Sequence, residues 1–168
     1  MSGDVRRTVS NTGPLISLEK LNHGYDFIRR LYGKVIIPLA VLNEVAAGQF
    51  EKPDAYLRYY GIMDLIEIGV VSKRYNFPEM ERLHEGEKQA IQLALELQLP
   101  LLIEETIGRH VAKSLGIPVS GIAGQIIKAF QQEVISATEA YNKLDELLKA
   151  GSINQKIYKS LVVAISKA

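Results

Sequence analysis

The 168-residue chain has no cysteine, and three of its other absences also limit what it can be. Without cysteine, disulfides, thiolate zinc sites and cysteine nucleophiles are excluded, so any metal must be held by oxygen or imidazole ligands. No apolar run approaches the roughly 20 residues that a membrane span requires. Residues 1–7 are charged and no long apolar run follows them, so we expect no signal peptide and a cytoplasmic protein. The sequence also lacks a phosphate loop, a dinucleotide-binding glycine motif and a nucleophile elbow.

The chain also lacks a large excess of positive or negative charge. The net charge is only +1, which excludes a strongly basic nucleic-acid binder but not a local basic patch. Hydrophobic residues make up 47% and charged residues 23%, the ordinary balance of a globular protein. A chain of this length can bury the core of one domain.

Strand-like and helix-like segments alternate along the first 120 residues, which is typical of an α/β sheet with crossover helices. The expected strands are 5–10, 34–37, 65–71, 99–103 and 117–120. The expected helices are 14–21, 24–32, 39–48, 87–98 and 106–115, and the expected loops are 48–54 and 72–86.

After residue 121 the pattern changes to helices alone. Capping boxes at 136–139 and 152–155 open two of them. We therefore expect a domain over 1–130 and a helical extension over 131–168, packed on that domain or on a dimer partner. The apolar stripe of the last helix (Ile153, Ile157, Leu161 and Ile165) exceeds what a solvated helix needs, which favours a homodimer.

Glu87 is the most informative single residue. On a helical wheel for 86–97 it falls near the middle of the apolar face, beside Ala90 and Ile91. A buried unpaired carboxylate is costly, so such a group is normally paired, protonated or bound to a metal. The alternative is a first-turn glutamate that reaches water and interacts with the helix dipole.

Other oxygen-bearing side chains follow the expected strands. Asn11 comes after the first strand, Glu44 lies in the helix after the second, and Glu104 and Glu105 follow the fourth. Because sites in parallel sheets form beyond the carboxyl ends of the strands, these groups are candidate ligands for Mg²⁺ or Mn²⁺. Each has a structural alternative: Asn11 as a turn or cap residue, Glu44 as a surface residue, and Glu104 and Glu105 as caps.

Basic and aromatic residues offer weaker signals. Arg109 and Lys113 lie four apart after Glu104 and Glu105, so they are candidates for holding a phosphate backbone, with a solvated helix face as the alternative. The three tyrosines at 56, 59 and 60 have spacing more typical of packing than of base stacking. The three histidines (23, 84 and 110) show no ligand spacing, so the sequence assigns them no metal role.

Five segments in order carry a resemblance to a known family. The run Ser10-Asn11-Thr12-Gly13-Pro14-Leu15-Ile16 resembles the opening motif of a PIN-like branch of bacterial and archaeal proteins. The similarity continues through 35–45, 86–91, 102–109 and 117–124, and so spans roughly 5–130.

The resemblance to PIN domains implies a three-layer α/β/α sandwich with a mainly parallel sheet. It also implies a Mg²⁺- or Mn²⁺-dependent ribonuclease acting on single-stranded RNA, as in the toxins of toxin–antitoxin pairs, with an antitoxin protein as partner. By matching position, the implied metal site is Asn11, Glu44, Glu87 and Glu104 with Glu105 beside it. Glu44, Glu87 and Glu104 would be catalytic, and Thr12 would orient Asn11.

Two positions depart from the family's pattern. Active PIN nucleases usually carry aspartate where this chain has Asn11 and Glu104. An amide offers a dipole instead of a charge, so metal affinity should be lower. One alternative is therefore a weakened module that binds RNA or a partner protein without cleavage. Another is a purely structural α/β protein whose acids are caps.

Overall fold

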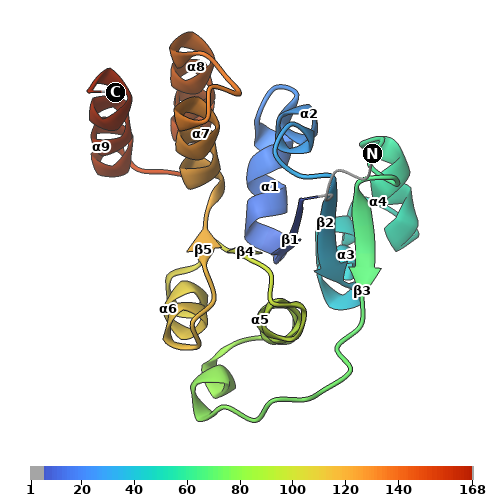
Figure 1. Ribbon diagram of the computed structural model, residues 1–168. Helices are drawn as coiled ribbons and strands as arrows, with labels where there is room; N and C mark the ends of the chain where they lie inside the picture. Colours follow the sequence, from blue (N-terminus) through green and yellow to red (C-terminus); the bar gives the residue numbers. More distant parts are fainter. Residues whose placement is uncertain (1–5, 168) are drawn as a thin grey trace, which may run out of the picture.

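A five-stranded, entirely parallel sheet forms the centre of the protein in a computed structural model that describes residues 6–167 (Figure 1). The strand order is β3-β2-β1-β4-β5. The strands are β1 (Arg7–Ser10), β2 (Lys34–Pro38), β3 (Ile66–Gly69), β4 (Leu101–Leu102) and β5 (Val119–Ser120). The five expected strands are present with shorter bounds; Val5, the first residue of the first expected strand, lies outside the described residues.

The strand residues alternate between two separate cores. Val35 and Ile37 belong to one hydrophobic cluster, whereas Ile36 between them belongs to the other. In β4, Leu102 and Leu101 divide in the same way. Because successive side chains of a strand point to opposite faces, both faces of the sheet are buried.

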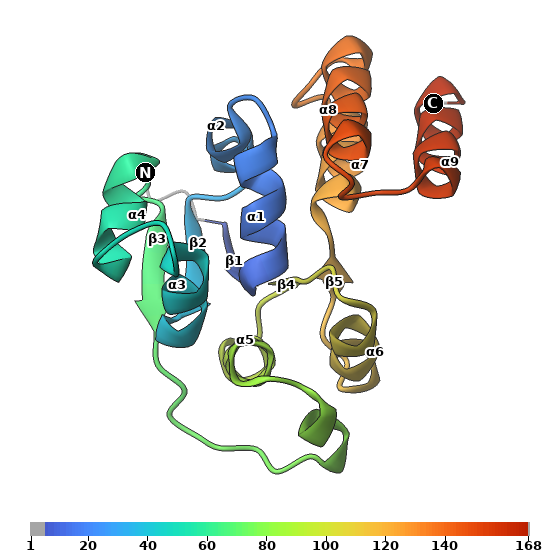
Figure 2. The same ribbon diagram turned by 180° about the vertical axis from the view of Figure 1, so that it is seen from behind.

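Helices cover the two faces unequally. The first core receives side chains from α1 (Thr12–Lys20), α2 (Gly24–Arg29), α3 (Leu39–Ala46), α4 (Pro53–Tyr59), α7 (Ile122–Gln131) and α8 (Ala137–Lys149). The second receives them from α5 (Glu85–Leu97), α6 (Thr106–Ser114) and the short 3₁₀ helix η1 (Pro78–Arg82). Figures 1 and 2 show α5 and α6 on one side of the sheet, and α1, α2 and α7 on the other. The predicted α/β/α sandwich is confirmed.

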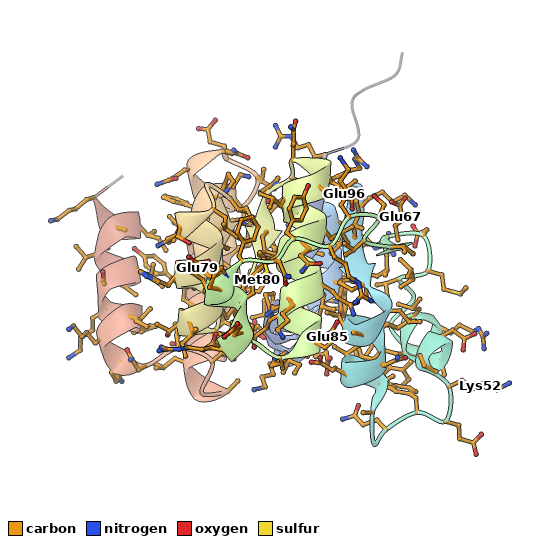
Figure 3. All side chains as sticks on the ribbon, turned by 90° about the horizontal axis from the view of Figure 1, so that it is seen from below. Lys52, Glu67, Glu79, Met80, Glu85 and Glu96 are labelled. Atoms are coloured by element: carbon orange, nitrogen blue, oxygen red, sulfur yellow. The ribbon has the colours of Figure 1, made fainter. Side chains whose placement is uncertain are left out.

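The direction of the strands decides where a site can form. All five strands end at the same edge, and the helices that connect parallel strands run back across the sheet. The first turn of α5 therefore lies at the carboxyl edge of the strands. Figure 3 labels Glu85 at this end of α5 and Glu96 at the other end.

The C-terminal helices pack on the rest of the chain. Ala140, Leu144 and Leu147 of α8 are fully buried in the same core as α1. The last helix, α9 (Gln155–Ser166), buries Ile165, but Ile157 remains 44% exposed. The division at residue 130 and the homodimer stay predictions.

Two short helices were not predicted from the sequence, and each begins at a proline in an expected loop. Helix α4 lies mostly beyond the expected loop 48–54; it starts at Pro53, whose fixed φ suits a first helical position, and it is held by buried Tyr56 and Leu57. Tyr56 packs against Phe50 and Tyr60, so the packing interpretation applies to it, whereas Tyr59 is 73% exposed. In the loop 72–86, η1 also begins at a proline and buries Met80. Among residues 6–167 no helix is long and apolar enough to cross a membrane.

The exposed side chain of Ile157 tests the expected homodimer. We expect the wild type to be a dimer at micromolar concentration and Ile157→Asp to be a monomer, because a charge on α9 would have to lose its hydration in an interface. Size-exclusion chromatography with light scattering measures both masses. Val70→Asp, which changes an 82% exposed side chain after β3, is the matched control and should leave the mass unchanged. A monomeric wild type would contradict the prediction.

Candidate functional site

Glu87 is buried at the carboxyl edge of the sheet, as the helical wheel predicted. It lies in the first turn of α5 and is only 6% exposed. Burial raises the pKa of its carboxyl group; the neighbouring His84 lowers it, and the charges of Glu105 and Glu44 raise it further. The net pKa is raised, so burial and repulsion together outweigh the histidine.

His84, which was assigned no metal role from its spacing, contacts two of the acids. Its Nε2 lies 2.5 Å from Oε1 of Glu87, and its Nδ1 lies 3.7 Å from Oε1 of Glu44. His84 and Glu87 are three residues apart at the start of α5, a spacing at which helical side chains meet. This spacing of three residues was the only feature of the sequence that indicated a contact between His84 and Glu87. Glu44 belongs to α3, so its proximity arises from the packing of α3 against α5.

Glu44 is held by a residue of the first motif. Oγ1 of Thr12 donates a hydrogen bond to its Oε2 at 2.7 Å. The resemblance implied that Thr12 orients Asn11, but its hydroxyl contacts Glu44 instead. Gly86 allows this arrangement, since a Cβ at that position would lie 2.3 Å from Oε1 of Glu44. Glu44 is thus partly exposed but fixed on both sides by other residues of the same edge.

Asn11 occupies the N-cap position of α1, yet its side chain makes no capping bond. The residue is 4% exposed, and its Oδ1 is buried without a hydrogen-bond partner in the described part of the chain. A buried acceptor left unsatisfied costs about 1–3 kcal/mol. The turn-or-cap interpretation therefore does not account for the side chain of Asn11.

Glu104 contacts α1 close to Asn11. Its Oε1 accepts a hydrogen bond from Oγ of Ser17 at 2.6 Å, and its Oε2 accepts one from the backbone N–H of Ile122 at 2.9 Å. A Cβ built on Gly13 would lie 3.9 Å from Oε1 of Glu104 and 4.0 Å from Oδ1 of Asn11, so the two side chains flank the same small space.

Glu105 behaves differently from the other acids. It is the N-cap of α6, and its two carboxylate oxygens accept hydrogen bonds from the backbone N–H groups of Ile107 (3.1 Å) and Gly108 (2.6 Å). The capping alternative therefore describes what Glu105 does here. Its carboxylate still lies close to that of Glu87, because both have an oxygen within 3.5 Å of a Cβ placed on Gly108.

The edge as a whole contains two groups of side chains. One group consists of Glu44, His84 and Glu87, and the other of Asn11 and Glu104. The two groups are connected through Thr12, which follows Asn11 in the chain and donates a hydrogen bond to Glu44. Within residues 6–167, no three histidine, aspartate or glutamate side chains converge closely enough to hold one ion directly. Mg²⁺ keeps several waters and needs only one or two carboxylates, so oxygen donors spread over an edge still suit such an ion.

The two candidate phosphate-binding residues differ in their surroundings. Arg109 is half-buried, and its Nη1 donates to the carbonyl of Ile103 at 3.4 Å. Together with Glu104, Ile153 and Ile157, it lines a groove of about 480 Å³. Lys113 is exposed one turn further along α6.

The fold and this edge define a nuclease-type α/β/α domain with acids at the carboxyl ends of parallel strands. A family model described as a PIN domain matches residues 7–167, and the chain belongs to the PIN-domain family. PIN domains are generally nucleases that use divalent metal ions, and PIN nucleases typically act on RNA. A search of the curated proteins found no match to this chain.

The raised pKa of Glu87 predicts a pH-dependent cost in the metal-free protein. A carboxyl group whose pKa is higher in the folded state binds more protons when folded, so its contribution to stability falls as the pH rises through its ordinary value of 4.5 and then through the raised value. Glu87→Gln should therefore raise Tm at neutral pH by about 2–4 °C, the shift that about 1 kcal/mol produces in a domain of this size. The gain should shrink toward pH 4. Chelator-treated protein melted between pH 4 and 8 gives both curves, and a Tm lowered at pH 7 would contradict the prediction.

Replacing Glu105 should destabilise the protein, in contrast to replacing Glu87. Because its carboxylate satisfies two backbone N–H groups of α6, Glu105→Ala should lower the free energy of unfolding by about 0.5–2 kcal/mol. Urea unfolding followed by circular dichroism measures the loss. Glu133→Ala, which removes a glutamate next to the end of α7, is the control; a loss no larger than that of the control would mean that the cap contributes nothing.

Proposed function

We propose that this PIN domain is a Mg²⁺- or Mn²⁺-dependent endoribonuclease that cleaves single-stranded RNA at the acidic edge. The observation that carries the proposal is Oδ1 of Asn11, a buried acceptor that lies beside Glu104 and has no donor among residues 6–167. An oxygen in that position lacks a positive partner, and a divalent cation is the partner that its acidic surroundings favour.

Asn11, Glu44, Glu87 and Glu104 would hold the ion, directly or through its waters, and Glu105 would add negative charge beside Glu87. A bound cation would supply a more acidic water and would neutralise charge on the phosphodiester during hydrolysis. Thr12 and Ser17 orient Glu44 and Glu104 through the hydrogen bonds of their hydroxyl groups. Glu44, Glu87 and Glu104 are the catalytic acids of the proposal.

Arg109 would place the RNA backbone against this edge. Its guanidinium group shares the groove with Glu104, so a phosphate that it binds lies next to the proposed catalytic acids. Lys113 would add a second, weaker contact from the exposed face of α6, and both contacts should weaken with salt. Thr12 would also help to bind substrate, although its hydroxyl already donates to Glu44.

A second function is supported by a different observation. Glu44 and Glu104 each accept hydrogen bonds from the protein itself, and Asn11 brings no charge. Acids satisfied in this way bind a cation less readily, which suits a module that binds RNA or a partner protein without cleavage.

The biological setting follows from the family resemblance. We propose the toxin of a toxin–antitoxin pair, acting in the cytoplasm and held inactive by a small antitoxin protein. A short reading frame next to the gene, whose product binds this chain and blocks RNA cleavage, would support the assignment.

Asn11 separates the nuclease from the binding module. Asn11→Asp should tighten Mn²⁺ binding by about 10-fold, since a carboxylate offers a full charge to the ion, and should raise RNA cleavage. Glu87→Gln should abolish both. Calorimetric Mn²⁺ titration and cleavage of a labelled single-stranded RNA measure the two effects.

Asn142→Asp is the control for added charge, because Asn142 is exposed on α8. It should leave the affinity and the cleavage rate unchanged. Negligible Mn²⁺ binding by the wild type and by both site variants would end the nuclease proposal and leave the binding module.

A further inference from the structure

The imidazole of His84 stands between two acids of the proposed metal site. Its two nitrogens face Glu87 at 2.5 Å and Glu44 at 3.7 Å, and these acids belong to different helices. Nothing in the family resemblance assigns this residue, and its position at the start of α5 sets it at the same edge as Asn11.

The contact with Glu87 places a nitrogen close to any cation that this carboxylate binds. Divalent ions of this kind sit about 2.1 Å from a carboxylate oxygen, so an ion on Oε1 of Glu87 lies within roughly 5 Å of Nε2 of His84. Coordination therefore requires the ring to turn and to give up its present contact with Oε1 of Glu87. The ring has room to rotate because the His84 side chain is 56% exposed.

The chemistry of the donors then distinguishes between metals. Mg²⁺ prefers oxygen ligands throughout, whereas Mn²⁺, which also favours carboxylates, binds an imidazole nitrogen more readily than Mg²⁺ does. In the adjoining group, Oδ1 of Asn11 has no hydrogen-bond partner within the described part of the chain, which is an independent sign that the edge takes a cation. With His84 included, the donor set is oxygen plus one nitrogen.

We propose that His84 is a nitrogen ligand of the metal centre and that it makes the site select Mn²⁺ over Mg²⁺. This inference rests on the proposed function for the existence of the site, and it adds the identity of the metal and a ligand outside the acidic set.

The variants that test the inference should fold. The side chain of His84 makes no capping bond to α5, so the start of the helix does not depend on it, and its replacement removes only the contacts with Glu87 and Glu44. His84→Gln keeps a polar side chain that is a poor ligand. His23→Gln is the matched control, since His23 is 73% exposed and pairs with Asp26 on α2.

Metal-free full-length protein is titrated with Mn²⁺ and, separately, with Mg²⁺ by calorimetry. Pulsed electron paramagnetic resonance of the Mn²⁺ complex, with and without ¹⁵N-histidine, detects nitrogen bound to the metal. We expect nitrogen coupling in the wild type and in His23→Gln and its loss in His84→Gln. Mn²⁺ affinity should fall by about 10-fold or more in His84→Gln, with Mg²⁺ affinity changing by less than about 3-fold.

The inference is overturned by a wild-type Mn²⁺ complex without nitrogen coupling. It is overturned equally if His84→Gln weakens Mn²⁺ and Mg²⁺ by the same factor, which would make His84 only a positioning residue. Wild-type protein that binds neither ion would remove the proposed function as well. Mn²⁺ bound through His84 without RNA cleavage would remove the nuclease proposal and leave this inference standing.

Discussion

Repulsion among carboxylates gathered at one sheet edge is the constraint on which the rest of this structure depends. Parallel strands end together, so residues that follow different strands are brought close whatever their charge. The protein offsets this cost with a separate neutral or cationic partner for each acid: a hydroxyl for Glu44, a hydroxyl and a backbone N–H for Glu104, two backbone N–H groups for Glu105, and an imidazole for Glu87. Even so, the pKa of Glu87 stays raised, so the compensation is incomplete.

Close packing at this edge depends on residues without side chains. A Cβ at Gly86 would meet the carboxylate of Glu44, and a Cβ at Gly108 would lie 2.6 Å from Cδ1 of Ile103. Gly86 lies in the first turn of α5, which carries Glu87, and Gly108 lies in the first turn of α6, which Glu105 caps. A methyl group at either position would push a carboxylate or a core side chain away. The acids are therefore held near one another by backbone geometry as much as by hydrogen bonds.

Much of the fold, and part of the site, follow from sequence patterns that are local or periodic. The alternation of strands and helices predicted the parallel sheet, and the wheel of α5 predicted that Glu87 is buried. Features that arise only from packing were missed: α4, whose helix is held by tyrosine contacts, and the bridge from His84 to Glu44 between α5 and α3. The hydroxyl groups that donate to Glu44 and Glu104 belong to residues 32 and 87 positions away, beyond any spacing rule.

At Asn11, the stability of the metal-free protein and the proposed metal binding favour different side chains. Every acid of the edge has a partner within the protein, but the amide oxygen of Asn11, with only 4% of the residue exposed, has none among residues 6–167. An aspartate there would have added another charge to an edge that already repels itself, and the amide lowers that cost in the metal-free state. The same replacement leaves an acceptor that only a cation or a water can satisfy. The chain thus combines a less repulsive metal-free edge with an unsatisfied oxygen. In the proposed metal centre, a site with one charge fewer would depend more on any additional donor, such as the imidazole of His84.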